Sequence, residues 1–249
     1  MSTISSEFFN CAIESSKQLC VLIDPDKFDN DRAAFFLKAL PVETAYILVG
    51  GSTVAPCKTE ATVKTLKTFT KTPIVLFPGE YTQITEAADG ILFLSLLSGR
   101  NPEYLIGQQI KSVSRLRNSK LEIIPTGYIL IDGGKESAVQ RVSNTLPLSQ
   151  NNVQLIVDTA LAGQFSGKKL IYLEAGSGAG YPVSEEIISA VKAAIDLPLM
   201  VGGGICDTTQ LQKAYKAGAD LVVIGTAFEK GNFAAQASRL SLESSESSR

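Results

Sequence analysis

The sequence predicts an α/β fold: a single modified (β/α)8 TIM barrel with one outer helix short or replaced. Eight short apolar runs recur along the 249-residue chain, and segments with helix signals separate them. The runs are continuously apolar, which is typical of parallel strands covered on both faces. The chain length also fits one such barrel. The predicted strands lie at 19–23, 45–49, 73–77, 91–95, 122–131, 169–173, 198–201 and 220–224.

Two of the intervening helices have well-marked ends. In 184–195, Ser184 is the predicted N-cap, and the two glutamates after it suit the positive end of the helix. In 207–217, Asp207 is the predicted N-cap, and Gly218 allows a left-handed stop. In the first of these helices the residues expected to face inward are Ile187, Ile188, Val191 and Ile195.

The segments on either side of the fourth strand differ from each other. The segment 78–90 is too short for a regular barrel helix with both of its loops, so one outer helix is expected to be short or replaced. The helix predicted at 101–116 begins at Asn101 and Pro102. Its apolar stripe consists of Leu105, Ile106, Ile110 and Val113.

The predicted domain organisation is simple. Residues 1–240 form one domain, in which an extra helix at 5–17 precedes the first strand. Residues 241–249 are expected to be a disordered polar tail. An open doubly wound sheet is the alternative architecture, but eight evenly spaced strands without a glycine-rich dinucleotide turn favour a closed barrel.

Composition excludes several classes of function. The net charge is −2, so a nucleic acid partner is not expected. The chain has no histidine, which excludes a Ser-His-Asp triad and histidine-ligated metals. Acid–base chemistry must therefore use carboxylates, lysine, tyrosine or the substrate. A divalent ion would need oxygen ligands, which favours Mg2+ or Mn2+.

The cysteines and the apolar runs bear on the cellular compartment. Cys11, Cys20, Cys57 and Cys206 form no C-x-x-C pair and are expected to be buried thiols in a reducing compartment. The N-terminal residues show no signal-peptide pattern. No apolar run approaches the roughly 20 residues of a membrane span, so a cytoplasmic protein is expected.

Three glycine-rich segments follow the last three predicted strands. Because strand ends converge on one mouth of a barrel, these segments are expected to bind a phosphate through backbone N–H groups. If the glycines had no ligand, they would only make tight turns. The predicted phosphate-binding residues include Gly176, Ser177, Gly178, Gly202, Gly203, Gly204, Gly225 and Thr226.

Two acidic residues follow predicted strands near this mouth. Asp24 ends the first strand and, with Ser52 from the next loop, is a candidate Mg2+ site. Equally, Asp24 can cap a turn or pair with Lys27. Glu174 follows the sixth strand and is the candidate catalytic group, to orient a substrate hydroxyl or take its proton. The alternative for Glu174 is a structural salt bridge.

Aromatic and apolar residues suggest a second subsite. Tyr172 and Tyr128 either donate hydrogen bonds inside the barrel or fill its core. The region around the fourth strand is strongly apolar and is either core or the wall of a groove for a long hydrocarbon. The predicted contacts of that groove are Tyr128, Leu96, Arg100 and Tyr104.

The motifs together resemble the geranylgeranylglyceryl phosphate synthase family. They are VLIDPDK, LVGGST, LFLSLLSGRNPEYLIG, PTGYILIDGG, YLEAGSGAGYPV, PLMVGGGI and VVIGTAFEK, and they span about residues 15–230. The resemblance implies a modified barrel and a Mg2+-dependent prenyltransferase. It implies transfer from geranylgeranyl diphosphate, or a longer homologue, to the 3-hydroxyl of sn-glycerol 1-phosphate. It also implies a dimer or hexamer, and product access to a membrane surface is a further expectation.

Carried over by position, the resemblance assigns roles to specific residues. It places Mg2+ at Asp24 and Ser52 and makes Glu174 the group that orients the hydroxyl and accepts its proton, with Tyr172 beside it. The glycerol phosphate contacts are Tyr172, Leu173, Glu174, Ala175, Gly176, Ser177, Gly178, Gly203, Gly204, Gly225 and Thr226. Two departures, Leu22 in place of a lysine and Gly-Thr in place of Gly-Asn, point to the larger archaeal-like branch and leave the preferred prenyl length open.

Two other functions remain open at this stage. One is another phosphosugar enzyme on the same scaffold, an isomerase with Asp24 and Glu174 as its acid–base pair, or a lyase with Lys135 or Lys27 as imine former. The other is a barrel that binds a phosphorylated ligand without chemistry. Fold analogy alone does not choose among them.

Overall fold

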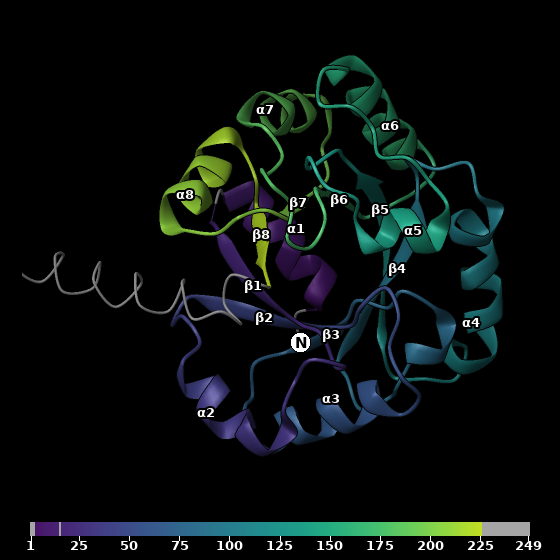
Figure 1. The fold of residues 1–249 in the computed structure, drawn as a ribbon, viewed down its shortest axis with the longest axis vertical. Coiled ribbons are helices and arrows are strands. Elements are labelled where there is room, and N and C mark those ends of the chain that lie inside the picture. Colours follow the sequence, from purple (N-terminus) through teal and green to yellow (C-terminus); the bar gives the residue numbers. More distant parts are fainter. Residues whose placement is uncertain (1–2, 15, 226–249) are drawn as a thin grey trace, which may run out of the picture.

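Eight parallel strands close into a barrel in chain order (Figure 1). The computed structural model describes residues 3–14 and 16–225. The strands are β1 (Gln18–Ile23), β2 (Thr44–Val49), β3 (Ile74–Leu76), β4 (Gly90–Leu96), β5 (Glu122–Leu130), β6 (Leu170–Glu174), β7 (Leu199–Gly202) and β8 (Leu221–Ile224). Strand β1 pairs with β8 from Gln18 to Val21, which closes the ring. All eight predicted strands and the closure are therefore confirmed.

Helices surround the barrel except beside β3. They are α1 (Ile4–Glu14), α2 (Ala33–Lys38), α3 (Lys58–Phe69), α4 (Gln108–Leu116), α5 (Ala138–Ser143), α6 (Val153–Phe165), α7 (Glu185–Ala194) and α8 (Thr208–Ala217). The connection from β3 to β4 contains only a 3-10 turn, Tyr81–Gln83. The prediction of a short or replaced outer helix is confirmed. None of the helices in the described residues is both long and apolar enough to cross a membrane.

The helix caps follow the sequence signals. The Ser184 side chain accepts a hydrogen bond from the backbone N–H of Ile187, and Asp207 does the same for Gln210. Gly218 ends α8 with a φ of 116°, which a residue with a side chain rarely adopts. These caps fix where α7 and α8 begin, close to the glycine-rich segments that precede them.

Apolar side chains fill two separate regions, as strands buried on both faces require. One region is the barrel interior, which includes Cys20, Leu48, Leu92, Tyr172 and Met200. The other lies between the strands and the outer helices and consists of two clusters. Residues that alternate along each strand therefore point either into the barrel or toward the helices.

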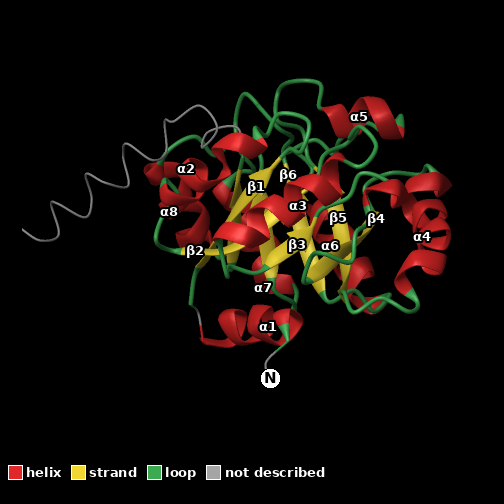
Figure 2. Cartoon of the chain, turned by 90° about the horizontal axis from the view of Figure 1, so that it is seen from below, coloured by secondary structure: helices red, strands yellow, loops and turns green. Residues whose placement is uncertain are grey.

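Helix α1 closes the end of the barrel opposite α5 (Figure 2). Its Ile4 and Phe8 join the interior cluster, and the Phe8 ring packs edge-on against Tyr46 with 5.0 Å between ring centroids. The Glu122 carboxylate at the start of β5 accepts hydrogen bonds from the backbone N–H groups of Ile4 (2.6 Å) and Ser5 (2.7 Å). A carboxylate thus caps the positive end of the plug helix.

Replacing Glu122 with glutamine is expected to destabilise the fold by about 1 kcal/mol at neutral pH. Burial raises the pKa of Glu122, but hydrogen bonds from Ser5 and Ile4 outweigh it and lower the pKa overall. The stabilisation is therefore present above the ordinary glutamate pKa and is lost as the pH falls through the lowered folded value. Urea unfolding of E122Q and wild type should converge at acid pH. Glu14→Gln, on the exposed end of α1, is the control. An equal deficit at every pH would refute the cap.

Helix α4 faces the barrel with the side opposite to the predicted apolar stripe. Ile106, Ile110 and Val113 are 50%, 65% and 51% exposed, whereas Gln109 and Ser112 are buried. The amide of Gln109 donates to the carbonyl of Leu94 (2.7 Å), so polar contacts fix the buried face. Most of the predicted stripe therefore faces outward, because periodicity gives the spacing of a face and not its partner.

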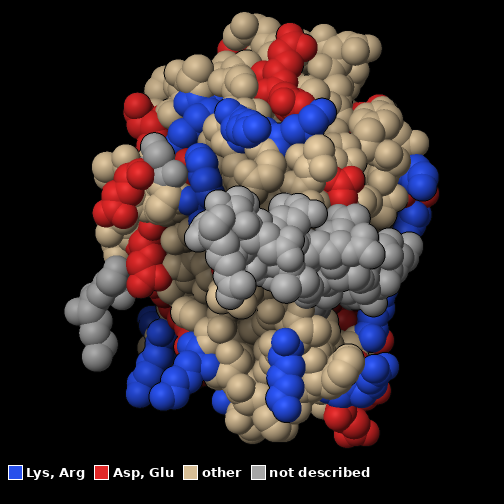
Figure 3. Space-filling model, turned by 90° about the vertical axis from the view of Figure 1, so that its left-hand side faces the viewer, with Lys and Arg blue, Asp and Glu red and all other residues tan. Residues whose placement is uncertain are grey.

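The cysteines and the surface charges complete the description of the fold. Cys11 and Cys20 are buried, but Cys57 and Cys206 are exposed, so the prediction of four buried thiols is half wrong. All four are free, as predicted. On the face shown in Figure 3, acidic and basic side chains are interspersed and form no single-sign field.

Candidate active site

Glu174 is the last residue of β6, and its carboxylate is buried at the barrel mouth, with the residue 7% exposed. It accepts a hydrogen bond from the Tyr172 hydroxyl (2.6 Å) and another from the Gly176 backbone N–H (2.8 Å). Burial raises the pKa of Glu174, and these two hydrogen bonds oppose that rise. Within residues 3–14 and 16–225, no lysine or arginine pairs with this carboxylate. A buried carboxylate with a raised pKa is a candidate base.

The glycines after β7 make room for this carboxylate. A side-chain carbon at Gly203 would lie 2.5 Å from Glu174 Oε1, and one at Gly202 would lie 2.7 Å from Glu174 Oε2. Gly203 and Gly204 also have φ values of 81° and 72°. Glycine is therefore required here for both space and backbone conformation. The sequence indicated a phosphate loop, whereas the contact with Glu174 emerges only in three dimensions.

The loop after β6 wraps against the β7 turn. Gly176 and Gly178 have φ values of 99° and 70°. A side-chain carbon at Gly204 would lie 2.8 Å from the backbone of Tyr181 and Pro182. The glycine turns predicted after β6 and β7 thus lie together beside Glu174, with backbone groups accessible at the mouth. Ser177 is exposed in the same loop.

The remaining predicted phosphate residues have different surroundings. The side chains of Leu173 and Ala175 belong to the outer apolar cluster, so only their backbone can take part in a ligand site. A side-chain carbon at Gly225 would lie 3.6 Å from Leu22, which places the end of β8 beside β1. Thr226 lies outside the described residues.

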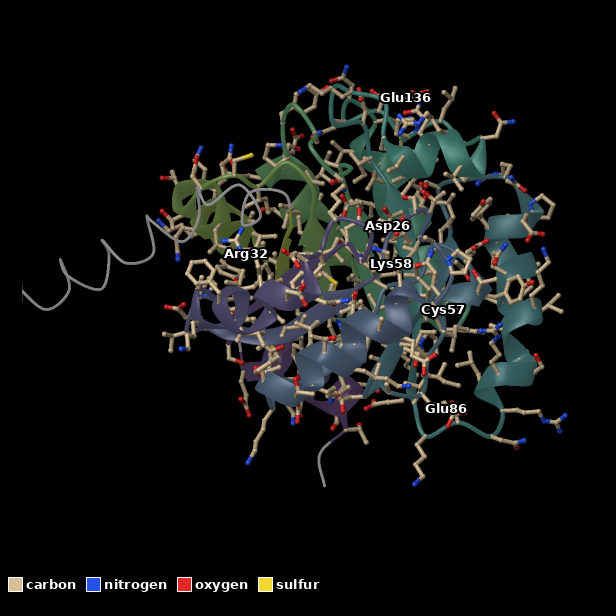
Figure 4. The ribbon with its side chains drawn as sticks, turned by 60° about the horizontal axis from the view of Figure 1, so that its bottom comes forward. Asp26, Arg32, Cys57, Lys58, Glu86 and Glu136 are labelled. Carbon is tan, nitrogen blue, oxygen red and sulfur yellow. The ribbon has the colours of Figure 1, made fainter. Side chains whose placement is uncertain are left out.

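The predicted metal residues occupy the neighbouring corner of the mouth. A side-chain carbon at Gly51 would lie 3.3 Å from Asp24 Oδ1, so Asp24 contacts the loop that carries Ser52. The Lys27 ammonium is 2.7 Å from Asp24 Oδ2, the pairing left open by the sequence. The Asp26 carboxylate accepts from the Ala55 N–H at 3.2 Å and joins the loops after β1 and β2 (Figure 4).

This corner fits a hard cation that takes few protein ligands. It offers a partly exposed carboxylate on Asp24 and a hydroxyl on Ser52, both oxygen donors. Within the described part of the chain, no three Cys, Asp or Glu side chains gather as a metal cage. Magnesium commonly binds through one or two carboxylates and substrate phosphates, so this donor set is adequate for it.

An apolar groove opens beside Ser52. It runs between β3, β4 and β5 on one side and α4 and α5 on the other, where the short β3–β4 connection leaves the barrel less covered. Its mostly apolar lining suits a hydrocarbon chain. Residues that line it include Phe77, Ile84, Leu92, Leu96, Tyr104, Tyr128 and Val142.

The groove includes three of the four predicted prenyl contacts. Leu96, Tyr104 and Tyr128 line it, which favours the groove over a purely structural role for this region. Arg100 does not line it; its guanidinium is exposed and donates to the Gly99 carbonyl at 2.8 Å. The Arg100 side chain is therefore used for a local turn in this structure.

Three aromatic rings connect the groove to Glu174: Phe77 and Tyr128 line the groove, and Tyr172 contacts Glu174. Phe77 is 5.5 Å from Tyr172 and 6.0 Å from Tyr128, and the two tyrosine rings are 5.4 Å apart, measured between centroids. Burial and the Glu174 charge raise the pKa of both tyrosines well above the ordinary value, so both stay neutral. Sequence reasoning missed Phe77, although it closes the run 73–77 at a strand end.

The lysines proposed for imine chemistry lack an enclosed site. Lys27 is 61% exposed and pairs with Asp24, and Lys135 is exposed in the loop after β5. An imine-forming lysine is normally activated by desolvation or by a neighbouring cation. Burial does lower the pKa of Lys168, but its ammonium donates to Ser95, in the layer outside the barrel.

Comparisons with known proteins agree over nearly the whole chain. Residues 12–240 match the PcrB family. A geranylgeranylglyceryl phosphate synthase of Zunongwangia profunda is 59% identical over 88% of this chain and 94% of its own, and one of Pyrococcus furiosus is 41% identical over 87% and 86%. A crystal structure of (S)-3-O-geranylgeranylglyceryl phosphate synthase from Thermoplasma acidophilum, in complex with its substrate sn-glycerol-1-phosphate, has a similar fold, with a TM-score of 0.88 and 32% sequence identity. The match covers 95% of this chain and 96% of that one. The chain therefore belongs to the PcrB family.

Proposed function

We propose that this protein is a prenyltransferase that joins a prenyl diphosphate to the 3-hydroxyl of sn-glycerol 1-phosphate through an ether bond and releases diphosphate. The observation that carries the proposal is the juxtaposition at one mouth of a buried base, Glu174, two glycine turns and an apolar groove. The relatives named above, one of them with sn-glycerol-1-phosphate bound, support the choice of both substrates.

The chain's own groups supply positioning and proton transfer. Backbone N–H groups of the loops after β6 and β7 hold the phosphate of the acceptor, and the dense glycines let it approach closely. Glu174 orients the acceptor hydroxyl and takes its proton as the oxygen bonds to C1 of the prenyl chain. The C1–oxygen bond breaks with its electron pair leaving on the diphosphate, so the charges balance.

A Mg2+ ion is part of the proposal. Asp24 and Ser52 would hold it, and when bound it would neutralise charge on the departing diphosphate. The diphosphate end of the groove lies beside Ser52, whereas the apolar remainder holds the prenyl tail. Geranylgeranyl diphosphate is the proposed donor.

The decisive assay incubates purified protein with radiolabelled sn-glycerol 1-phosphate, geranylgeranyl diphosphate and Mg2+. The expected result is label in the organic phase only when all three are present. sn-Glycerol 3-phosphate is the stereochemical control, and shorter and longer diphosphates report the preferred chain. Absence of extractable product with every chain length would overturn the proposed function.

Replacing Asp24 with asparagine is expected to raise the Mg2+ concentration for half-maximal activity by about 10- to 100-fold, the range seen when a metal site loses a supporting group. The side chain keeps its size but loses its charge. Initial rates across a Mg2+ titration measure the effect, and Asp31→Asn, exposed in the turn after β1, is the control. An unchanged titration curve would remove Asp24 from the metal site.

We also propose a cytoplasmic homo-oligomer, a dimer or a hexamer, whose product leaves toward a membrane surface. The exposed residues Ile110 and Val113 of α4, with Ile106 in the turn just before it, support a protein contact, because contiguous exposed apolar residues commonly mark interfaces. Ile110→Lys is expected to lower the sedimentation coefficient, and Lys120→Glu beyond the helix is the control. A variant that sediments like wild type would exclude α4 from the contact.

A further inference from the structure

The aromatic cluster of Phe77, Tyr128 and Tyr172 separates the two halves of the proposed site. Phe77 and Tyr128 line the apolar groove, and both rings contact Tyr172. The Tyr172 hydroxyl in turn donates to Glu174. The path from Ser52, where the diphosphate would lie, to the proposed base therefore passes these rings.

Packing fixes the position of Phe77. The Phe77 N–H donates to the Val49 carbonyl at 2.9 Å, which extends the β2–β3 ladder by one residue. A side-chain carbon at Gly50 would collide with the backbone of Phe77, so the ends of the two strands are in direct contact. The Phe77 backbone therefore lies next to the start of the 50–52 loop, and the Phe77 side chain lines the same groove as Ser52.

We infer that the rings of Phe77 and Tyr128 stabilise the positive charge that develops on the allylic carbon of the prenyl donor as the diphosphate leaves. This inference rests on the proposed function and adds two catalytic residues to it. Aromatic faces attract cations more strongly when water is excluded, and a prenyl chain bound along the apolar groove would exclude it. Aromatic rings suit a delocalised carbocation because they are weaker nucleophiles than a carboxylate, which could bond to the cation and trap it.

Glu80 is the competing group, since it also lines the groove and carries a carboxylate. Its Oε1 accepts a hydrogen bond from the Thr82 hydroxyl (2.5 Å) at the β3–β4 connection. If a carboxylate rather than a ring balances the developing charge, Glu80→Gln should lower kcat while changes to the Phe77 ring leave it unaltered.

The test grades the electron density of one ring without changing its packing. Phe77 is replaced by mono-, di- and trifluorinated phenylalanine, and kcat is measured with geranylgeranyl diphosphate and sn-glycerol 1-phosphate. The expected result is a stepwise fall in log kcat with each fluorine, and a loss of about 10- to 30-fold in Phe77→Leu. The same series at Phe28, which packs edge-on against Phe36 at 5.2 Å outside the barrel, should be flat.

A binding measurement gives a second readout that does not require turnover. An ammonium analogue of the prenyl diphosphate, with the positive charge near the allylic position, should bind wild type more tightly than its neutral carbon isostere. Calorimetry should show this preference reduced about tenfold in Phe77→Leu and retained in Glu80→Gln.

The outcomes separate the two proposals. If wild type makes ether product but kcat is independent of fluorination and only the KM of the prenyl diphosphate changes, the rings are a tail wall and this inference is overturned. A preference for the ammonium analogue that survives in Phe77→Leu overturns it as well. If wild type makes no ether product, the proposed function falls, and this inference falls with it.

Discussion

Glu174→Gln is expected to lower kcat by about 10²- to 10⁴-fold, the range typical of losing a general base. Glutamine keeps the size of the side chain, and its single carbonyl oxygen can accept the hydrogen bond from the Gly176 N–H while its NH2 group donates to the Tyr172 hydroxyl oxygen. It cannot accept the proton of the acceptor hydroxyl. The KM for glycerol phosphate should change little, because the backbone phosphate donors remain. Steady-state kinetics of the extractable product measure both constants.

The pH dependence tests the same assignment. Because burial raises the pKa of Glu174, the acid limb of kcat/KM should have its midpoint above the ordinary glutamate value. A raised folded pKa also means that the ionised carboxylate destabilises the fold once the pH rises through that value. E174Q should therefore unfold at a higher temperature than wild type at neutral pH, with the difference vanishing in acid.

An exposed glutamate, Glu185, provides a matched control. Glu185 begins α7, is exposed and pairs with Lys213 at 3.3 Å, so Glu185→Gln should retain wild-type kinetics. A kcat of Glu174→Gln within about threefold of wild type would be far smaller than the effect of losing a general base. It would show that Glu174 only orients the acceptor. A stability that falls rather than rises would point to a structural role for the charge.

The sequence predicts the barrel well because its signals are local and repeated. Each strand is a continuous apolar run, and Ser184 and Asp207 mark helix starts through their own side chains. The outward orientation of Ile110 was not predictable in this way. It depends on what the neighbouring elements present, here a polar contact from Gln109 to Leu94 and a groove behind α4.

The candidate site was predictable to the extent that its residues follow strands. The rule that strand ends converge identifies Glu174, Gly203 and Asp24, and the structure brings the first two into contact. The same rule would have found Phe77, which ends the third run. The rule does not show which residues touch across the mouth, because that depends on barrel stagger and loop conformation. Arg100 shows the limit, since its guanidinium is held by its own turn.

Replacing Gly203 with alanine is expected to combine a loss of stability with a loss of activity. The φ of 81° costs a residue with a side chain about 1–2 kcal/mol. The new methyl group would also lie 2.5 Å from Glu174 Oε1 and 2.6 Å from the Gly176 nitrogen, so the carboxylate and the phosphate loop must both move. Displacement of reacting groups by about 1 Å lowers turnover about 10²-fold, and this loss should appear in kcat/KM for glycerol phosphate.

Gly167 separates the two effects. It has a φ of 84° after α6, and a side-chain carbon there would meet nothing within 4 Å. Gly167→Ala should therefore show a similar loss of stability in urea unfolding with unchanged kinetics, since only the backbone strain is shared. If both variants lose stability and neither loses activity, the contact between the β7 turn and Glu174 has no catalytic role. If only Gly203→Ala loses activity, the glycine turn positions the base, because the backbone strain is common to both and the collision with the carboxylate is not.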